Sequence, residues 1–167
     1  LGLTHDHIWD NLSQVAEDKG AQLVAAADPH EQLLGKVERE FSCRPYRNYE
    51  TMLDNEELDA VYLCIPPTVH TDELLITADK GIPLFVEKPQ TLDLKQAVEF
   101  NAAIEKTGII SQVGFVYRYE PSSAPTRELL SKRTPRHAQL QNFYSGQPIR
   151  YWTLSLIHIS EPTRRYA

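Results

Sequence analysis

Residues 79–89 read Asp-Lys-Gly-Ile-Pro-Leu-Phe-Val-Glu-Lys-Pro, and this stretch decides the fold class. A glycine closes the helix-like segment before it, a short apolar run follows at once, and that run ends abruptly in charged residues. A glycine followed directly by an apolar run is typical of the loop that joins a helix to a buried parallel strand. The stretch therefore predicts one unit of an α/β fold.

The same rhythm recurs along most of the chain. Amphipathic helices are expected near residues 8–18, 33–41, 69–80 and 93–107, with a short, weaker helix over 49–54. Apolar strands are expected at 23–27, 60–65, 83–86 and 109–116. Asp93 and Gln96 form a capping-box-like start for the last helix, and Gly108 ends it. This alternation predicts a doubly wound, Rossmann-type parallel sheet with helices on both faces.

The pattern changes after residue 120. Residues 122–125 indicate a linker or turn, residues 126–132 a short helix, and residues 136–144 a strand of a new unit. We expect residues 1–120 to be the Rossmann domain with a truncated first strand, and 121–153 to be the start of an incomplete C-terminal α/β domain. Residues 154–167 are expected to be a non-native tail, because 154–164 resemble translated sequencing-adapter sequence.

Composition excludes several classes of protein. The 167 residues are 41% hydrophobic, and their net charge of -6 argues against a surface that follows nucleic-acid phosphates. The two cysteines, Cys43 and Cys64, are too few for a disulfide framework or a metal cluster. The longest apolar run, residues 60–65, is too short to span a bilayer. We expect no nucleic-acid or membrane partner and a cytoplasmic location, although an export signal upstream of Leu1 would not be visible.

Polar or conformationally unusual residues follow each expected strand. In an open parallel sheet, ligands bind at the carboxyl ends of the strands. The residues at these ends are Gly2, Asp28, Pro66 and Pro67 with His70, Glu87-Lys88-Pro89, and Arg118 in the segment 117–119. The sequence therefore predicts that they gather at one edge of the sheet. For Arg118, a surface ion pair with Glu120 is the alternative role.

Residues 2–7, Gly-Leu-Thr-His-Asp-His, stand where a dinucleotide phosphate loop would lie. Thr4 and His7 replace the second and third glycines of the G-x-G-x-x-G pattern. The N-terminus of the following helix still supplies N–H donors and a favourable dipole for a pyrophosphate. His5 and His7 alone are too few ligands to hold a metal ion, so we expect histidines near a phosphate and no metal.

Asp28 has two possible roles. It follows Gly2 by 28 - 2 = 26 residues, near the roughly 20 expected of the acid that binds the adenosine ribose hydroxyls. Alternatively, Asp28, Pro29 and Glu31 start a helix as N-cap, N1 and N3. The surrounding βαβ pattern favours the ribose role. A carboxylate here would repel a 2′-phosphate, so we expect NAD to be preferred over NADP.

The sharpest feature is Glu87-Lys88-Pro89. Proline biases Lys88 toward an extended backbone, which would direct the lysine side chain out of the sheet edge. A lysine so placed can donate to a substrate oxygen or transfer a proton. A surface salt bridge between Glu87 and Lys88 is the alternative.

Three motifs together resemble the Gfo/Idh/MocA oxidoreductases, relatives of glucose–fructose oxidoreductase and inositol dehydrogenase. They are residues 60–67 with His70, residues 81–89, and residues 113–115 with Arg118 and Pro121. The resemblance covers Gly2 to about Tyr144. It implies an N-terminal Rossmann domain that binds NAD or NADP, followed by a C-terminal α/β domain that holds the substrate.

The resemblance also implies residue roles. Lys88 would be the catalytic residue beside nicotinamide and substrate, with the proton-transfer Asp/His pair of the family in the second domain, beyond this chain. The expected cofactor-binding residues are Gly2, Thr4, His5, His7, Asp28, Cys64, Pro66, Pro67, His70, Glu87, Lys88 and Arg118.

The expected activity is hydride transfer to or from a sugar or polyol hydroxyl by a homo-oligomeric, full-length enzyme. This chain alone is expected to be inactive, because the substrate domain is incomplete. Two alternatives stay open at this point. One is an NAD-dependent glycosidase or lyase of the same family, and the other is a non-catalytic nicotinamide-sensing module on the same scaffold.

Overall fold

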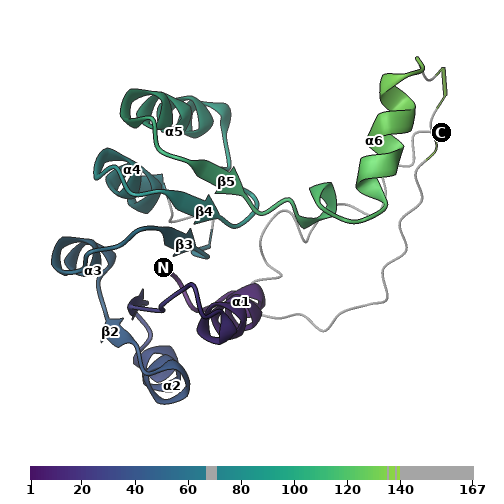
Figure 1. Ribbon diagram of the computed structural model, residues 1–167. Coiled ribbons are helices and arrows are strands. Elements are labelled where there is room, and N and C mark those ends of the chain that lie inside the picture. Colours follow the sequence, from purple (N-terminus) through teal and green to yellow (C-terminus); the bar gives the residue numbers. More distant parts are fainter. Residues whose placement is uncertain (67–70, 135, 138, 140–167) are drawn as a thin grey trace, which may run out of the picture.

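The computed structural model describes residues 1–66, 71–134, 136, 137 and 139, in which helices and short strands alternate (Figure 1). In chain order the elements are α1 (Asp6–Glu17), β1 (Ala25–Ala27), α2 (Glu31–Phe41), β2 (Arg44–Tyr46), α3 (Tyr49–Asn55), β3 (Val61–Leu63), α4 (Thr71–Asp79), β4 (Leu84–Val86), α5 (Leu94–Thr107), β5 (Ser111–Val113), the 3-10 helix η1 (Val116–Arg118) and α6 (Ser123–Ser131). The α/β alternation predicted from the sequence is confirmed.

The N-terminal residues join two groups of parallel strands into one arrangement. β2 pairs with β1, and β3, β4 and β5 pair in that order. The Cys64 amide donates to the Leu1 carbonyl at 2.7 Å, and the Gly2 amide donates to the Ala27 carbonyl at 2.9 Å. Residues 1–2 therefore lie between β1 and β3. The resulting order, β2–β1–(1–2)–β3–β4–β5, is that of a doubly wound Rossmann sheet.

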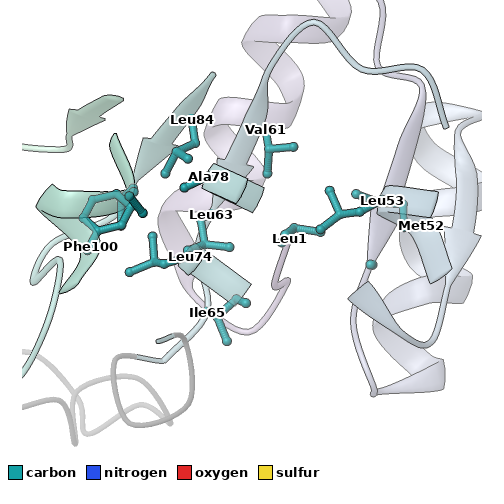
Figure 2. Close-up of a cluster of buried hydrophobic side chains, with 13 residues drawn as sticks. Leu1, Met52, Leu53, Val61, Leu63, Ile65, Leu74, Ala78, Leu84 and Phe100 are labelled. Atoms are coloured by element: carbon teal, nitrogen blue, oxygen red, sulfur yellow. The ribbon is translucent and has the colours of Figure 1, made fainter. Parts of the chain in front are cut away.

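Helices cover both faces of this sheet because the strand residues alternate in direction. Val61 and Leu63 of β3 belong to the hydrophobic cluster beneath α3, α4 and α5, whereas Cys64 belongs to the cluster beneath α1 and α2. Figure 2 shows the first cluster, whose buried members outside the strands include Met52, Leu53, Leu74, Ala78, Phe100 and Ala103. The two clusters make up the core.

The helix boundaries follow from local capping. The Gln96 amide donates to Asp93 Oδ1 at 2.9 Å at the start of α5, and Gly108 ends that helix in the left-handed conformation at φ 70°. The short helix α3 starts at Asn48, whose side chain accepts a hydrogen bond from the Thr51 amide at 2.8 Å. These caps confirm the predicted start and end of α5 and the existence of the short helix.

The structure differs from the expected elements at three places. β2 was not predicted, because Pro45 lies within it; the strand is at the edge of the sheet, where the missing N–H of proline is tolerated. The linker or turn expected over 122–125 is limited to Ser122, since α6 begins at Ser123 with Pro125 in its first turn, where a helical N–H has no partner in any case. The strand expected over 109–116 is shorter, because η1 begins at Val116.

Beyond β5, Figure 1 shows α6, in green, standing apart from the sheet. Most of the strand expected over 136–144, and all of the tail expected over 154–167, lie outside the described residues. Within the part of the chain that the structure describes, no helix has both the length and the apolar character needed to cross a membrane.

Gly2 provides a test of the central position of the N-terminal residues. It has a φ of +83°, and a Cβ added there would lie 2.8 Å from backbone atoms of Cys64 and Ile65. We therefore expect Gly2→Ala to lower the free energy of unfolding by more than the roughly 1–3 kcal/mol that a strained backbone conformation alone costs. Urea denaturation measures this loss.

Gly81→Ala is the matched control. Gly81 has a similar φ of +74°, but a Cβ added there meets no atom within 4 Å. This variant should show only the cost of the backbone conformation. Equal losses in the two variants would mean that Gly2 is not packed against the end of β3.

Candidate cofactor site at the carboxyl edge of the sheet

The loop that follows Gly2 leads directly into α1. Its residue His5 is the N-cap of α1, and His5 Nδ1 accepts a hydrogen bond from the His7 amide at 3.2 Å. The hydroxyl oxygen of Thr4, in the same loop, is buried and has no hydrogen-bond partner among the described residues. The loop thus presents a buried hydroxyl and the start of a 12-residue helix at the carboxyl edge of the sheet.

Asp28 ties this loop to the segment after β1. Its side chain is almost fully buried, Oδ2 accepts from the Leu3 amide at 2.6 Å, and Oδ1 accepts from the His30 amide at 2.8 Å. The His30 ring also lies 2.8 Å from Asp28 Oδ1 through its Nδ1 atom. The N-cap of α2 is His30, so the alternative role of Asp28, as the N-cap of that helix, is wrong. Asp28 instead fixes the backbone of the loop 2–7 by accepting the hydrogen bond from the Leu3 amide.

Glu87 at the end of β4 faces the start of α1. Its Oε1 lies 2.9 Å from His7 Nδ1, and its Oε2 accepts a hydrogen bond from the Lys88 amide at 2.7 Å. Burial of Glu87 opposes its ionisation. The hydrogen bonds from His7 and from the Lys88 amide outweigh this effect, so the pKa of Glu87 is held below its ordinary value. Glu87 is therefore an ionised, buried carboxylate at neutral pH.

Lys88 follows directly. Its Nζ atom lies 3.9 Å from Glu87 Oε2, and its side chain is only 17% exposed. A separation of this length is beyond hydrogen-bonding distance, and the pair is not on the surface. The geometry therefore disfavours the surface salt bridge that was the alternative role for Lys88.

Cys64 and Pro66 come after β3. Cys64 is buried, and burial raises the pKa of its thiol to about 12, so it is a neutral packing group. Pro66 is half-buried, whereas Pro67 and His70 lie outside the described residues.

Arg118, in η1, is exposed, and no ion pair joins it to Glu120 among the residues with described positions. The structure thus brings the loop 2–7, Asp28, Glu87 and Lys88 to one edge.

Gly114 is a residue of this edge whose role the sequence did not reveal. A Cβ at this position would lie 3.2 Å from the Phe85 ring and 3.5 Å from the carboxyl carbon of Glu87. The glycine after β5 therefore leaves room chiefly for the Phe85 ring, whereas the Glu87 carboxyl carbon would be at ordinary van der Waals distance. The only signal in the sequence was its place in the Val113-Gly114-Phe115 motif, which does not indicate which neighbour needs the space.

Comparison with known proteins agrees with the Rossmann-type fold. The family model GFO_IDH_MocA, described as an oxidoreductase family with an NAD-binding Rossmann fold, matches residues 7–115. The chain is 33% identical over 129 residues to scyllo-inositol 2-dehydrogenase (NAD(+)) of Bacillus subtilis, covering 76% of this chain and 37% of the relative. It is 31% identical over 86 residues to D-xylose 1-dehydrogenase (NADP(+)) 2 of Haloferax volcanii, covering 52% and 26% of the two chains.

A solved structure leads to the same family. The crystal structure of myo-inositol 2-dehydrogenase from Lactobacillus plantarum superposes with a TM-score of 0.69 at 26% identity, covering 78% of this chain and 39% of that one. The chain thus spans less than half the length of the proteins it matches. Because the family model matches well over half of the 167 residues, this chain belongs to the GFO_IDH_MocA family of oxidoreductases with an NAD-binding Rossmann fold.

Proposed function

We propose that this chain is the cofactor-binding part of an NAD(P)-dependent oxidoreductase that acts on a sugar or polyol hydroxyl. The observation that carries the proposal is the meeting of the loop 2–7, Asp28 and Glu87-Lys88 at the carboxyl edge of a parallel sheet, where ligands of such sheets bind. The two relatives described above are named for oxidation of a polyol and of a sugar. Their names also include both NAD and NADP.

The residues of the loop fit a dinucleotide, even though two of the three usual glycines are absent. The buried Thr4 hydroxyl lacks a hydrogen-bond partner within the described part of the chain, and a phosphate oxygen would supply one. The N-terminus of α1 adds backbone N–H groups and a favourable dipole. Gly2 allows the loop to pass close to the end of β3. Thr4 and the start of α1 would hold the pyrophosphate, and Asp28 would lie on the ribose side.

A nicotinamide, when bound, supplies the acceptor or donor of the hydride. The part of this chain in the reaction is to position the substrate hydroxyl whose proton is transferred. We assign to Lys88 the hydrogen bond to the substrate oxygen, where its ammonium can donate or its amine can accept a proton. Glu87 is a positioning residue: it is fixed by His7 on one side and by the Lys88 amide on the other, so Lys88 projects from a rigid strand end.

Asp28 leads to a prediction about cofactor preference. A buried carboxylate beside the ribose would repel the 2′-phosphate of NADP, and like charges brought together cost several kcal/mol. No lysine or arginine occurs among residues 29–35 to compensate. We expect NAD to bind at least about tenfold more tightly than NADP, which corresponds to about 1.4 kcal/mol. Isothermal titration calorimetry with both dinucleotides measures this difference.

Asp28→Asn is the informative variant, because it removes the charge and keeps the size. It should narrow the preference for NAD, and it should also cost roughly 1–3 kcal/mol of stability through the weakened contacts to the Leu3 and His30 amides. Tighter binding of NADP by the unsubstituted chain would show that Asp28 does not select the cofactor.

Lys88 leads to a prediction about turnover in the full-length protein. Lys88→Ala should lower kcat by about 10²- to 10⁴-fold, the range expected for loss of a positioned proton-transfer group. The melting temperature should change little, because Lys88 belongs to neither hydrophobic cluster. Lys88→Arg should not restore turnover, since a guanidinium stays protonated and is bulkier than an ammonium.

Lys95→Ala is the control for this prediction. Lys95 is 85% exposed on α5, and it pairs with Glu99 on the same helix. Its substitution removes the same charge from the chain without touching the edge of the sheet. Turnover of Lys88→Ala within about threefold of the Lys95→Ala value would show that Lys88 is not a catalytic residue.

A further inference from the structure

Three side chains with metal-binding chemistry converge at the start of α1. His5, His7 and Glu87 each offer a ligand atom, and these atoms all lie within 4.8 Å of one another. We propose that the three residues form a binding site for one divalent transition-metal ion of the zinc class. The proposal does not depend on the binding of a dinucleotide.

The convergence results from the fold and not from local spacing. His5 caps α1 and His7 lies in its first turn, so their ring centroids are 4.5 Å apart. Glu87 comes from the end of β4, 80 residues further along the chain from His7. Two neighbouring histidines are too few to hold a metal ion, and the sequence alone therefore predicted none. The sheet supplies the third ligand.

The donor set specifies the class of ion. Two imidazoles with one carboxylate are used by zinc sites that keep a further position for water. Magnesium and calcium prefer oxygen ligands, so two ring nitrogens select against them. A bound cation would take the place of the proton between His7 Nδ1 and Glu87 Oε1, which are 2.9 Å apart. The negative charge of Glu87, whose side chain is only 7% exposed, would then be balanced by the cation.

A simpler account of the same contacts is an ion pair between His7 and Glu87, with His5 acting only as the helix cap. That account predicts no specific binding of a metal ion by the chain. It also gives no ligand-binding reason for His7, which stands at the third glycine position of the phosphate-loop pattern. The two accounts are separated by a titration with the metal alone.

The experiment is a zinc titration of the 167-residue chain after removal of bound metal, in competition with a chromophoric chelator. We expect one ion per chain, and a visible spectrum of low-symmetry, four- or five-coordinate Co²⁺ when cobalt replaces zinc. His5→Gln, His7→Gln and Glu87→Gln should each weaken binding by more than the roughly 10- to 100-fold that loss of an outer-shell partner costs. His137→Gln, at an exposed histidine, should leave the affinity unchanged.

Circular dichroism of each variant shows whether it folds, so that a loss of zinc affinity can be distinguished from a loss of structure. If Glu87→Gln does not fold, His7→Gln decides, because the His7 side chain is 42% exposed and tolerates a change of shape. Unchanged zinc affinity in folded His7→Gln, or an equal loss in His137→Gln, would overturn the proposal. A parallel NAD titration separates the two proposals: zinc binding without NAD binding contradicts the proposed function alone, and NAD binding without zinc binding contradicts the metal site alone.

Discussion

The Leu1 carbonyl accepts a hydrogen bond from the Cys64 amide, and the Gly2 amide donates one to the Ala27 carbonyl. These two contacts place the N-terminal residues between β1 and β3, where they connect a pair of strands to a group of three. The ends of β1, β3 and β4 consequently lie along one edge. The positions of Asp28, Glu87 and Lys88 relative to the loop 2–7 all depend on this central segment.

Two buried carboxylates then hold the loop from opposite sides. Asp28 accepts the Leu3 amide from the end of β1, and Glu87 contacts the His7 ring from the end of β4. Burying a carboxylate is costly unless hydrogen bonds satisfy it, and each of these groups has at least two partners. In the usual three-glycine loop, close approach of the backbone is possible because side chains are absent. Here His7 fills one such position and contributes a side-chain contact in its place.

Local signals explain why most of the fold could be predicted from the sequence. Helix periodicity, the Asp93 cap and Gly108 act within a few residues, and they locate α5 correctly. β2 was missed because Pro45 contradicts the usual strand pattern and only its place at the sheet edge makes it acceptable. At the candidate site, the position of Asp28 and Lys88 at the carboxyl edge could be predicted because both residues follow strands. The contact between His7 and Glu87 could not, because it joins residues 80 positions apart that have no shared local pattern.

Amide hydrogen exchange at Cys64, followed by NMR, tests the central position of residues 1–2 most directly. The account predicts that the Cys64 amide exchanges as slowly as the Glu87 amide, which donates to the Leu63 carbonyl inside the sheet. The Gly20 amide, which donates to the exposed side chain of Asp18, gives the rate for a loop. Exchange of the Cys64 amide at the Gly20 rate would contradict the account, because β1 and β3 would then not be joined through the N-terminal residues.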